Sequence, residues 1–350
     1  MIFYTLFIFL FVMLAANYRL SCINDSMVLF VQKSRLYLAI LLVICVSIFR
    51  FDVGYDYSEY YRMVYPSLDE EVERFEPLSR LICYVVYYLK WPPALFIIFG
   101  LLAYYFYFST LRRYSGNLYF ALLAFIAFVY TTDFGNIRQG IAVAICFWGY
   151  RYICSKSLIK YLLVCFVASL FHATAVVAIP IYFVYNYFNT FYCVLFTVIL
   201  LAGFNVLMAY LSDLNFYANY LEVLDEFEGG DKKKYTNVLW LFLMVLIDFL
   251  GRKNRENASL YFVIWFGILV PFLLGGHFGG RISRYYLVYL CLLIPKSLSH
   301  SSLLVRNVVC IGLIAYFLLL LYINSQGTGS MVPYQSIFSI DYQNPHFRIK

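Results

Sequence analysis

Three arginines in two short polar segments are the residues of this sequence best suited to chemistry. Arg138 lies in NIRQGIAVA, and Arg281 and Arg284 lie in GGHFGGRISRYY. A guanidinium presents a planar fork of N–H donors that fits phosphate oxygens, and Arg281 and Arg284, three residues apart, share one face of a helix. The alternative for any single arginine is a side chain that snorkels to the lipid headgroups. Three together predict a site for an anion of the phosphate type.

Carboxylates would supply the second half of that chemistry. Asp52, Asp56 and Glu59 surround Gly54, and Glu76 precedes a proline. A carboxylate beside an apolar boundary can have a raised pKa and act as a general base toward a hydroxyl group. We predict this role first for Asp56 and second for Glu76.

Further polar residues complete the candidate site. His172 is predicted either to act as a base or phosphate contact, or to be a hydrogen-bonded structural residue. Tyr57 and the tyrosines around it would stack on sugar rings. The predicted catalytic residues are Asp56, Glu76, Arg138 and His172, and the predicted substrate-binding residues are Arg281, Arg284, Asn136, Gln139, Asp52, Tyr57, Glu59 and His277.

Long apolar runs separate these segments and define the class of protein. Of the 350 residues, 63% are hydrophobic, 21% aromatic and 13% charged, whereas a soluble domain carries about 25% charged residues. Runs of roughly 15–22 apolar residues approach the length that crosses a hydrocarbon core as a helix, and they lack the two-residue alternation of a barrel. We predict an all-α polytopic membrane protein in which residues 1–350 form one integral domain.

The predicted protein has about 12 transmembrane helices and one short helix in the membrane interface. The predicted spans are residues 1–17, 36–51, 93–111, 118–133, 137–154, 158–172, 174–188, 191–211, 235–250, 258–276, 282–297 and 303–323.

Basic residues orient these helices. Short loops rich in Lys and Arg face the cytoplasm, and placing five such loops inside leaves both termini and every candidate segment on the outer side. That orientation requires residues 77–90 to form a helix in the outer interface, and the alternative is a thirteenth span with one misplaced basic loop. The main outer loops are then residues 52–92, which include the interface helix, and residues 212–234.

Signatures of other chemistries are missing from the sequence. It has no DxD pair, HExxH, GxSxG or phosphate-loop motif, and its nine cysteines form no CxxC pair. The bases behind the net charge of +7 lie in short loops that orient the protein, and charges near mid-span are nearly absent, which argues against an ion-coupled transporter. We therefore expect no metal, no cofactor and no nucleic-acid partner.

These segments, in this order, resemble the EpsG / Wzy family of polysaccharide polymerases, the O-antigen polymerase type. The resemblance covers about residues 50–340 and rests on RFDVGYDYSEYYR, EPLSRLI, NIRQGIAVA, KSLIKYLLVCFVASLFHATA, RISRYYLVYL and VPYQSIF. One departure is Ala173, which follows His172 where family members often carry a lysine. This departure weakens a cationic role at that position.

The resemblance implies an enzyme of the bacterial inner membrane, on a GT-C-like scaffold, that joins repeat units at the periplasmic face without a metal. Its donor and acceptor would be undecaprenyl-pyrophosphate-linked glycans drawn from the lipid bilayer, and a chain-length regulator and a flippase would act in the same pathway. On this hypothesis the arginines hold the departing pyrophosphate, a carboxylate takes the proton of the acceptor hydroxyl, and the transfer inverts the anomeric centre. The alternatives are a lipid-linked oligosaccharide flippase and an O-antigen ligase.

Overall fold

The computed structural model describes residues 2–16, 26–189, 191–195, 198–199, 257–274, 276–299, 301–325 and 331–339. Within these ranges every regular element is a helix, and an isolated bridge joins Arg50 to Ser336. The all-helical prediction is confirmed. The predicted spans 191–211 and 235–250 and the predicted loop 212–234 lie wholly or largely outside the described residues.

Three of the described helices are long and apolar enough to cross a membrane. They are Phe30–Ile48 within α2 (Ser26–Ile48), α5 (Pro93–Tyr114) and α18 (Leu303–Ile323). Large apolar side chains stay exposed on their outer faces, as contiguous apolar surface does where lipid covers a protein. The count of twelve spans stays a prediction.

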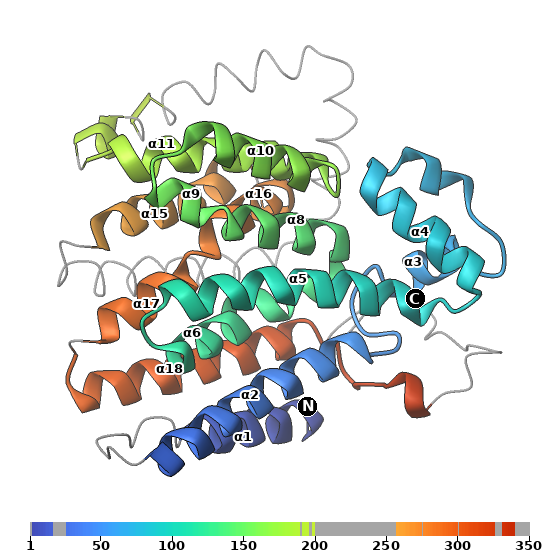
Figure 1. Cartoon of the computed structure of the whole chain (residues 1–350), viewed down its shortest axis with the longest axis horizontal. Helices are drawn as coiled ribbons and strands as arrows, with labels where there is room; N and C mark the ends of the chain where they lie inside the picture. The colour runs from blue at the N-terminus through green and yellow to red at the C-terminus, as the bar shows by residue number, and fades with distance from the viewer. Residues whose placement is uncertain are drawn as a thin grey trace.

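Shorter helices fill the bundle, and most run side by side along its long axis (Figure 1). They are α1 (Ile2–Ala16), α6 (Leu118–Phe125), the π-helical η3 (Ile126–Tyr130), α7 (Thr132–Gly135), α8 (Ile137–Trp148), α9 (Tyr150–Cys154), α10 (Leu158–Ser169), η4 (Ala173–Ala178), α11 (Ile179–Tyr187), α15 (Ala258–Leu274), α16 (Gly276–Leu287) and α17 (Leu290–Leu298). α5 packs against α8, α15 packs against α16, and α17 packs against α6.

Turns divide or shorten several of the predicted spans. Residues 137–154 form α8 and α9, and residues 282–297 fall into α16 and α17. Between α8 and α9, Gly149 packs so closely that an added Cβ would lie 3.0 Å from the Tyr161 ring. α10 ends at Ser169, earlier than predicted, and His172 becomes the N-cap of η4. His172 therefore lies in a turn, beyond the apolar helix.

α3 (Tyr57–Met63), η2 (Glu70–Arg74) and α4 (Pro77–Leu89) lie together at one end of the bundle, on the right in Figure 1. Proline at the first position of α4 suits a helix start, because that N–H would have no partner within the helix. The 13 residues of α4 span about 20 Å, too short to cross a hydrocarbon core of about 30 Å. Its predicted place in the membrane interface is compatible with this length and stays a prediction.

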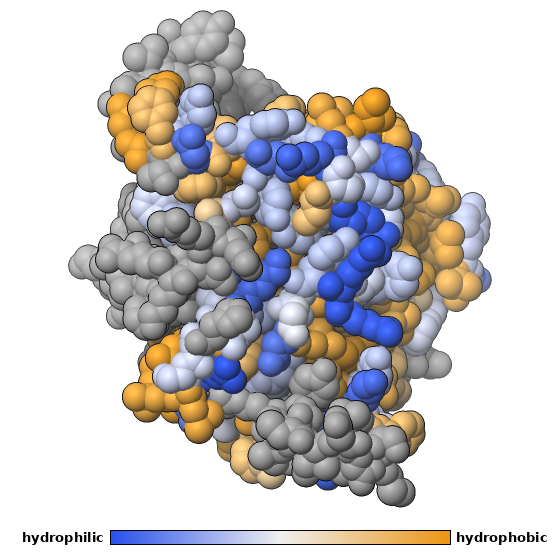
Figure 2. Space-filling model, turned by 60° about the vertical axis from the view of Figure 1, so that its left-hand side comes forward, coloured by the Kyte–Doolittle hydropathy of each residue, from blue (hydrophilic) through white to orange (hydrophobic). Residues whose placement is uncertain are grey.

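The turns that hold the candidate residues lie at the same end, called here the site end. Because successive helices alternate in direction, the turns at residues 49–56, 131–136 and 170–172 meet there, whereas those at 115–117 and 155–157 lie at the opposite end (Figure 1). Hydrophilic residues gather on that opposite end (Figure 2). Arg112, Arg113, Lys156 and Lys160 are exposed in or beside the turns of that end. Which side of the membrane each end faces stays a prediction.

Arg50 and Gly54 fix the loop that follows α2 onto the turn that precedes α8. Arg50 is 2% exposed, and its Nε and Nη2 donate to the carbonyl oxygens of Val53 and Phe134, each at 3.1 Å. Gly54 has a φ of +109°, and an added Cβ there would clash with the Phe134 carbonyl. The two segments are therefore in direct backbone contact.

Candidate functional site

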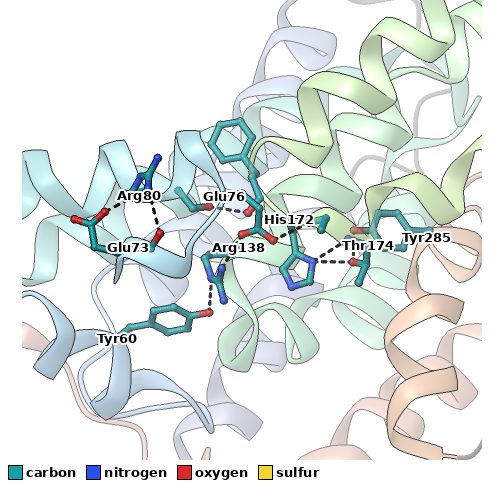
Figure 3. Close-up of polar contacts among 11 residues, drawn as sticks. Tyr60, Glu73, Glu76, Arg80, Arg138, His172, Thr174 and Tyr285 are labelled. Atoms are coloured by element: carbon teal, nitrogen blue, oxygen red, sulfur yellow. Dashed lines mark hydrogen bonds and ion pairs between the residues drawn. The ribbon is translucent and has the colours of Figure 1, made fainter. Parts of the chain in front are cut away.

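Arg138 is the centre of the contacts at the site end (Figure 3). It lies in the first turn of α8, where its Nη1 is 2.8 Å from Oε2 of Glu76 and its Nε donates to the Tyr60 hydroxyl at 3.0 Å. Its guanidinium lies 3.7 Å from the centre of the Phe75 ring, within cation–π distance. Side chains from α3, from the residues just before α4 and from α8 therefore meet at one guanidinium.

Glu76 links this arginine to the turn between α10 and η4. It is the N-cap residue of α4, with an extended backbone ahead of Pro77. Its Oε2 pairs with Arg138, and its Oε1 accepts a hydrogen bond from the backbone N–H of Ala173 at 2.8 Å. The Arg138 and Glu76 side chains are 19% and 20% exposed, so water screens this pair less than it screens a surface pair.

His172 lies next to this pair and is held through its Nδ1 atom. Nδ1 accepts a hydrogen bond from the backbone N–H of Thr174 at 3.3 Å and lies 2.8 Å from Oγ1 of Thr174, which is 3.0 Å from the Tyr285 hydroxyl. The pKa of His172 is lowered to about 4, first by burial and then by the positive charges of Arg138, Arg281 and Arg284, while Glu76 acts in the opposite direction. The imidazole is therefore neutral at pH 7, and all three arginines lie near it.

A second cluster joins α16 to the turn before α8. Arg284 forms an ion pair through Nη2 with Oδ1 of Asp133 and donates through Nη1 to Oε1 of Gln139 at 3.0 Å. The Gln139 amide donates in turn to the carbonyl oxygen of Arg281 at 2.7 Å. Gln139 is 1% exposed and the Arg284 and Asp133 side chains are 14% and 10% exposed, so this cluster lies beneath the surface.

Arg281 is the arginine of the three whose side chain makes no hydrogen bond or ion pair with another described residue. It lies about one turn before Arg284 on α16, and it forms no ion pair within the part of the chain that the structure describes. Its Nε is buried and has no hydrogen-bond partner in those same ranges. A buried donor without a partner is an unusual feature that a bound acceptor would satisfy.

The remaining predicted residues differ in how close they come to this cluster. Asp56, half-buried, is the N-cap residue of α3 and lies one turn before Tyr60, whereas Glu59 is exposed on the same helix. Asn136 is the half-buried N-cap residue of α8. The backbone of His277 is in α16, and its side chain is outside the described part of the structure.

Asp52 and Tyr57 are packed into the core, and the substrate contacts predicted for them stay a prediction. Asp52 is 2% exposed, and Tyr57 is fully buried with its ring stacked on Phe96 at a centroid distance of 3.9 Å. One face of the short helix α3 packs Tyr57 and Tyr61 into the aromatic core, so these rings stabilise the fold.

Several residues of the site were not in the predicted set. Phe75 contacts Arg138, and so does Tyr60, which was predicted only as a sugar-stacking ring and instead holds this arginine. Thr174 and Tyr285 hold His172, and Asp133 holds Arg284. Asp133 had a usable signal, because an acid that ends an apolar run is rarely without a partner. The aromatic and hydroxyl residues had none, since the chain contains 36 tyrosines and 35 phenylalanines.

A helical, apolar bundle with a charged cluster at one end defines a polytopic membrane protein with a polar site. A family model described as the EpsG family matches residues 35–336, and the chain belongs to this family. The match spans every residue of the two clusters, confirms the resemblance found in the sequence and indicates a polysaccharide polymerase-like role. Searches among curated proteins and among solved structures gave no match.

Proposed function

We propose that this chain polymerises undecaprenyl-pyrophosphate-linked oligosaccharide repeat units by glycosyl transfer, making an O-antigen or capsule type of polysaccharide. The site end would face the periplasm, and the basic turns of the opposite end would face the cytoplasm of a bacterial inner membrane. The observation that carries the proposal is that Arg138, Arg281 and Arg284 meet at one end of the bundle: Gln139, the neighbour of Arg138 on α8, bonds to Arg284 and to the Arg281 carbonyl. Membership of the EpsG family supports it.

The three arginines would contribute to pyrophosphate binding in different ways. Arg281 offers a buried Nε–H without a partner in the described residues, so it would donate to a phosphate oxygen without losing an existing contact. Arg138 is held by Glu76 through one ion pair at 2.8 Å, and a pyrophosphate with more than one negative charge would compete for it. Arg284, paired with Asp133 beneath the surface, would add positive potential from behind.

Glu76 is better placed than Asp56 to act as the general base, which reverses the order predicted from the sequence. When pyrophosphate draws Arg138 away, Oε2 of Glu76 loses its positive partner and becomes available to the acceptor hydroxyl. The acceptor hydroxyl oxygen would then bond to the anomeric carbon, and its proton would pass to Glu76. The bond from that carbon to the phosphate oxygen breaks, and undecaprenyl pyrophosphate leaves with the electron pair, so the anomeric centre inverts.

α4 would bring this carboxylate to the edge of the membrane. Leu81, Val85 and Tyr88 are 55%, 44% and 78% exposed along one stripe of α4, whereas Cys83 and Val86 face the bundle. An exposed apolar stripe on a short helix suits a position in the lipid interface. Substrates anchored by a polyprenyl chain would then reach Glu76 from within the bilayer.

The decisive experiment is a reconstituted reaction. Purified protein is incubated with a lipid-pyrophosphate repeat unit, alone or with lipid A core, and Arg281→Ala is compared with Arg74→Ala, an exposed arginine of the same end. We expect a ladder of products from the wild type and from Arg74→Ala, and a loss of about 10²–10³-fold for Arg281→Ala. Transfer to lipid A core alone would indicate a ligase, and transport without a new glycosidic bond would indicate a flippase.

A further inference from the structure

The hydrogen bonds of His172 fix which of its ring nitrogens carries the proton. A backbone N–H can only donate, so the bond from the N–H of Thr174 makes Nδ1 an acceptor. The contact of 2.8 Å between Nδ1 and Oγ1 of Thr174 must then use the hydroxyl proton of Thr174. In a neutral imidazole with Nδ1 as acceptor, the proton is on Nε2.

Tyr285 completes this chain from the interior of the bundle. Since Oγ1 of Thr174 donates to the ring, its 3.0 Å contact with the Tyr285 hydroxyl has the tyrosine as donor. Tyr285 is 1% exposed and lies on α16, one turn after Arg281. A buried phenol thus donates to the hydroxyl group that donates to Nδ1, and a backbone amide donates to Nδ1 directly.

The opposite nitrogen faces the candidate site. Nε2 makes no hydrogen bond among the described residues, and Figure 3 shows the ring with Thr174 on one side and Glu76 and Arg138 on the other. The charges that act on the ring are those of Glu76, Arg138, Arg281 and Arg284. An anion bound between these arginines would lie within reach of the Nε2–H group.

We propose that Thr174 and Tyr285 are positioning residues that hold His172 as the Nε2–H tautomer, so that it donates a hydrogen bond to the pyrophosphate and takes no proton from the acceptor hydroxyl. The inference rests on the proposed function for the identity of the anion. Its chemical basis is geometric, because both donors to Nδ1 occupy the lone pair that a general base would use. The role of base is thereby left to a carboxylate.

Variants at position 172 distinguish a donor from a base in the reconstituted reaction. The amide of His172→Gln places an N–H donor near the Nε2 position, the shorter His172→Asn does not reach it, and His172→Ala has no donor. We expect His172→Gln to keep activity within about tenfold of the wild type, and His172→Asn and His172→Ala to lose about 10²-fold. An equal loss in all three would overturn the inference, because none of them can act as a base.

A second measurement tests the tautomer without any turnover. ¹⁵N NMR of protein labelled at its histidines, with the His172→Gln spectrum subtracted, reports which nitrogen of His172 carries the proton. We expect Nε2 in the wild type and in Thr174→Ser, which keeps the hydroxyl, and a larger Nδ1–H population in Thr174→Val. A proton on Nδ1 of the wild type overturns the inference, whereas a proton on Nε2 in a protein that builds no polymer overturns the proposed function alone.

Discussion

Glu76 uses its two carboxylate oxygens for two different partners. Oε2 pairs with Arg138, and Oε1 accepts from the N–H of Ala173, so the side chain is fixed at both oxygens. Removing one member of a partly buried ion pair leaves the other charge without compensation. A neutral amide at position 76 therefore removes both a proton acceptor and a negative charge. Neutral variants of other acids in the same loop remove a charge alone, so they separate the two effects.

We expect Glu76→Gln to lower kcat by about 10²–10⁴-fold, the usual contribution of a general base. Glu73→Gln is the matched control, because Glu73 is 59% exposed and pairs with Arg80 on the surface; it should keep wild-type activity. Asp56→Asn should retain more activity than Glu76→Gln. Product ladders measured for the three variants check this order, and a more damaging Asp56→Asn would transfer the role of base to Asp56.

The low pKa of His172 predicts a pH-dependent stability. Its folded-state pKa is about 4, below the ordinary value of 6.5, so the unfolded chain takes up the proton first as the pH falls. Stability should therefore fall by on the order of 2–3 kcal/mol between about pH 6.5 and pH 4. Thermal unfolding of detergent-solubilised wild type and His172→Gln measures this: the part of the decrease due to His172 should vanish in the variant.

The segment around the start of α8 forms ion pairs with two other parts of the bundle. It offers an acid to α16 and a base to the residue that precedes α4. The chain passes from the π-helical η3 through the short α7 into α8, and it directs Asp133 to Arg284 on α16 and Arg138 to Glu76 beside α4. Irregular helical turns of this kind are common at functional sites. Gly140 makes room beneath, since an added Cβ would lie 2.9 Å from Cγ of Asp133.

We expect Asp133→Asn to destabilise the protein by about 3–5 kcal/mol, because Arg284 would stay buried without its counter-charge. The double variant Asp133→Asn with Arg284→Gln should be less destabilised than the sum of the single variants. The exposed Glu73–Arg80 pair provides the comparison, with an expected effect of about 0–1 kcal/mol when broken. Unfolding midpoints in detergent are measured for the two single variants, the double variant and the broken surface pair. Additive effects of Asp133 and Arg284 would contradict a coupled pair.

At the scale of the whole molecule, the charge distribution separates two ends. Exposed basic residues such as Arg112, Arg113 and Lys160 lie toward one end, and the mixed acidic and basic cluster lies at the other. Helices that alternate in direction bring residues far apart in sequence to one end: Glu76 and Arg138 are 62 residues apart, and Asp133 and Arg284 are 151 apart.

Accessibility to a membrane-impermeant thiol reagent tests the proposed orientation. Glu70 is exposed on η2 at the site end, and Lys160 is exposed at the start of α10 near the opposite end. In a Cys154→Ser background, which removes an exposed native thiol, we expect Glu70→Cys to react from the periplasm of intact cells. Lys160→Cys should react only after the inner membrane is opened, and the reverse pattern would invert the orientation.

The sequence predicted the segments that meet but not the pairs that they form. Composition and the alternating direction of successive helices were sufficient to predict that the segments of Arg138, His172 and Arg284 meet at one end of the bundle. Which acid pairs with which base depends on side-chain directions across helices that only the packed structure defines, so the Arg284–Asp133 pair was not predicted. The burial of Tyr57 was not predicted for a related reason. The position of a tyrosine within one turn of α3 determines whether its ring faces the core or the surface.

The contact between Gly54 and the carbonyl of Phe134 leaves room for a hydrogen atom and for nothing larger. The oxygen that crowds position 54 is also the one that Arg50 holds, so it cannot simply swing aside. A methyl group at position 54 would push apart the loop that leads to Tyr60 and the turn that leads to Arg138. The distance between the segments of Tyr60 and Arg138 is therefore set by a backbone contact outside the candidate site, which requires glycine at position 54.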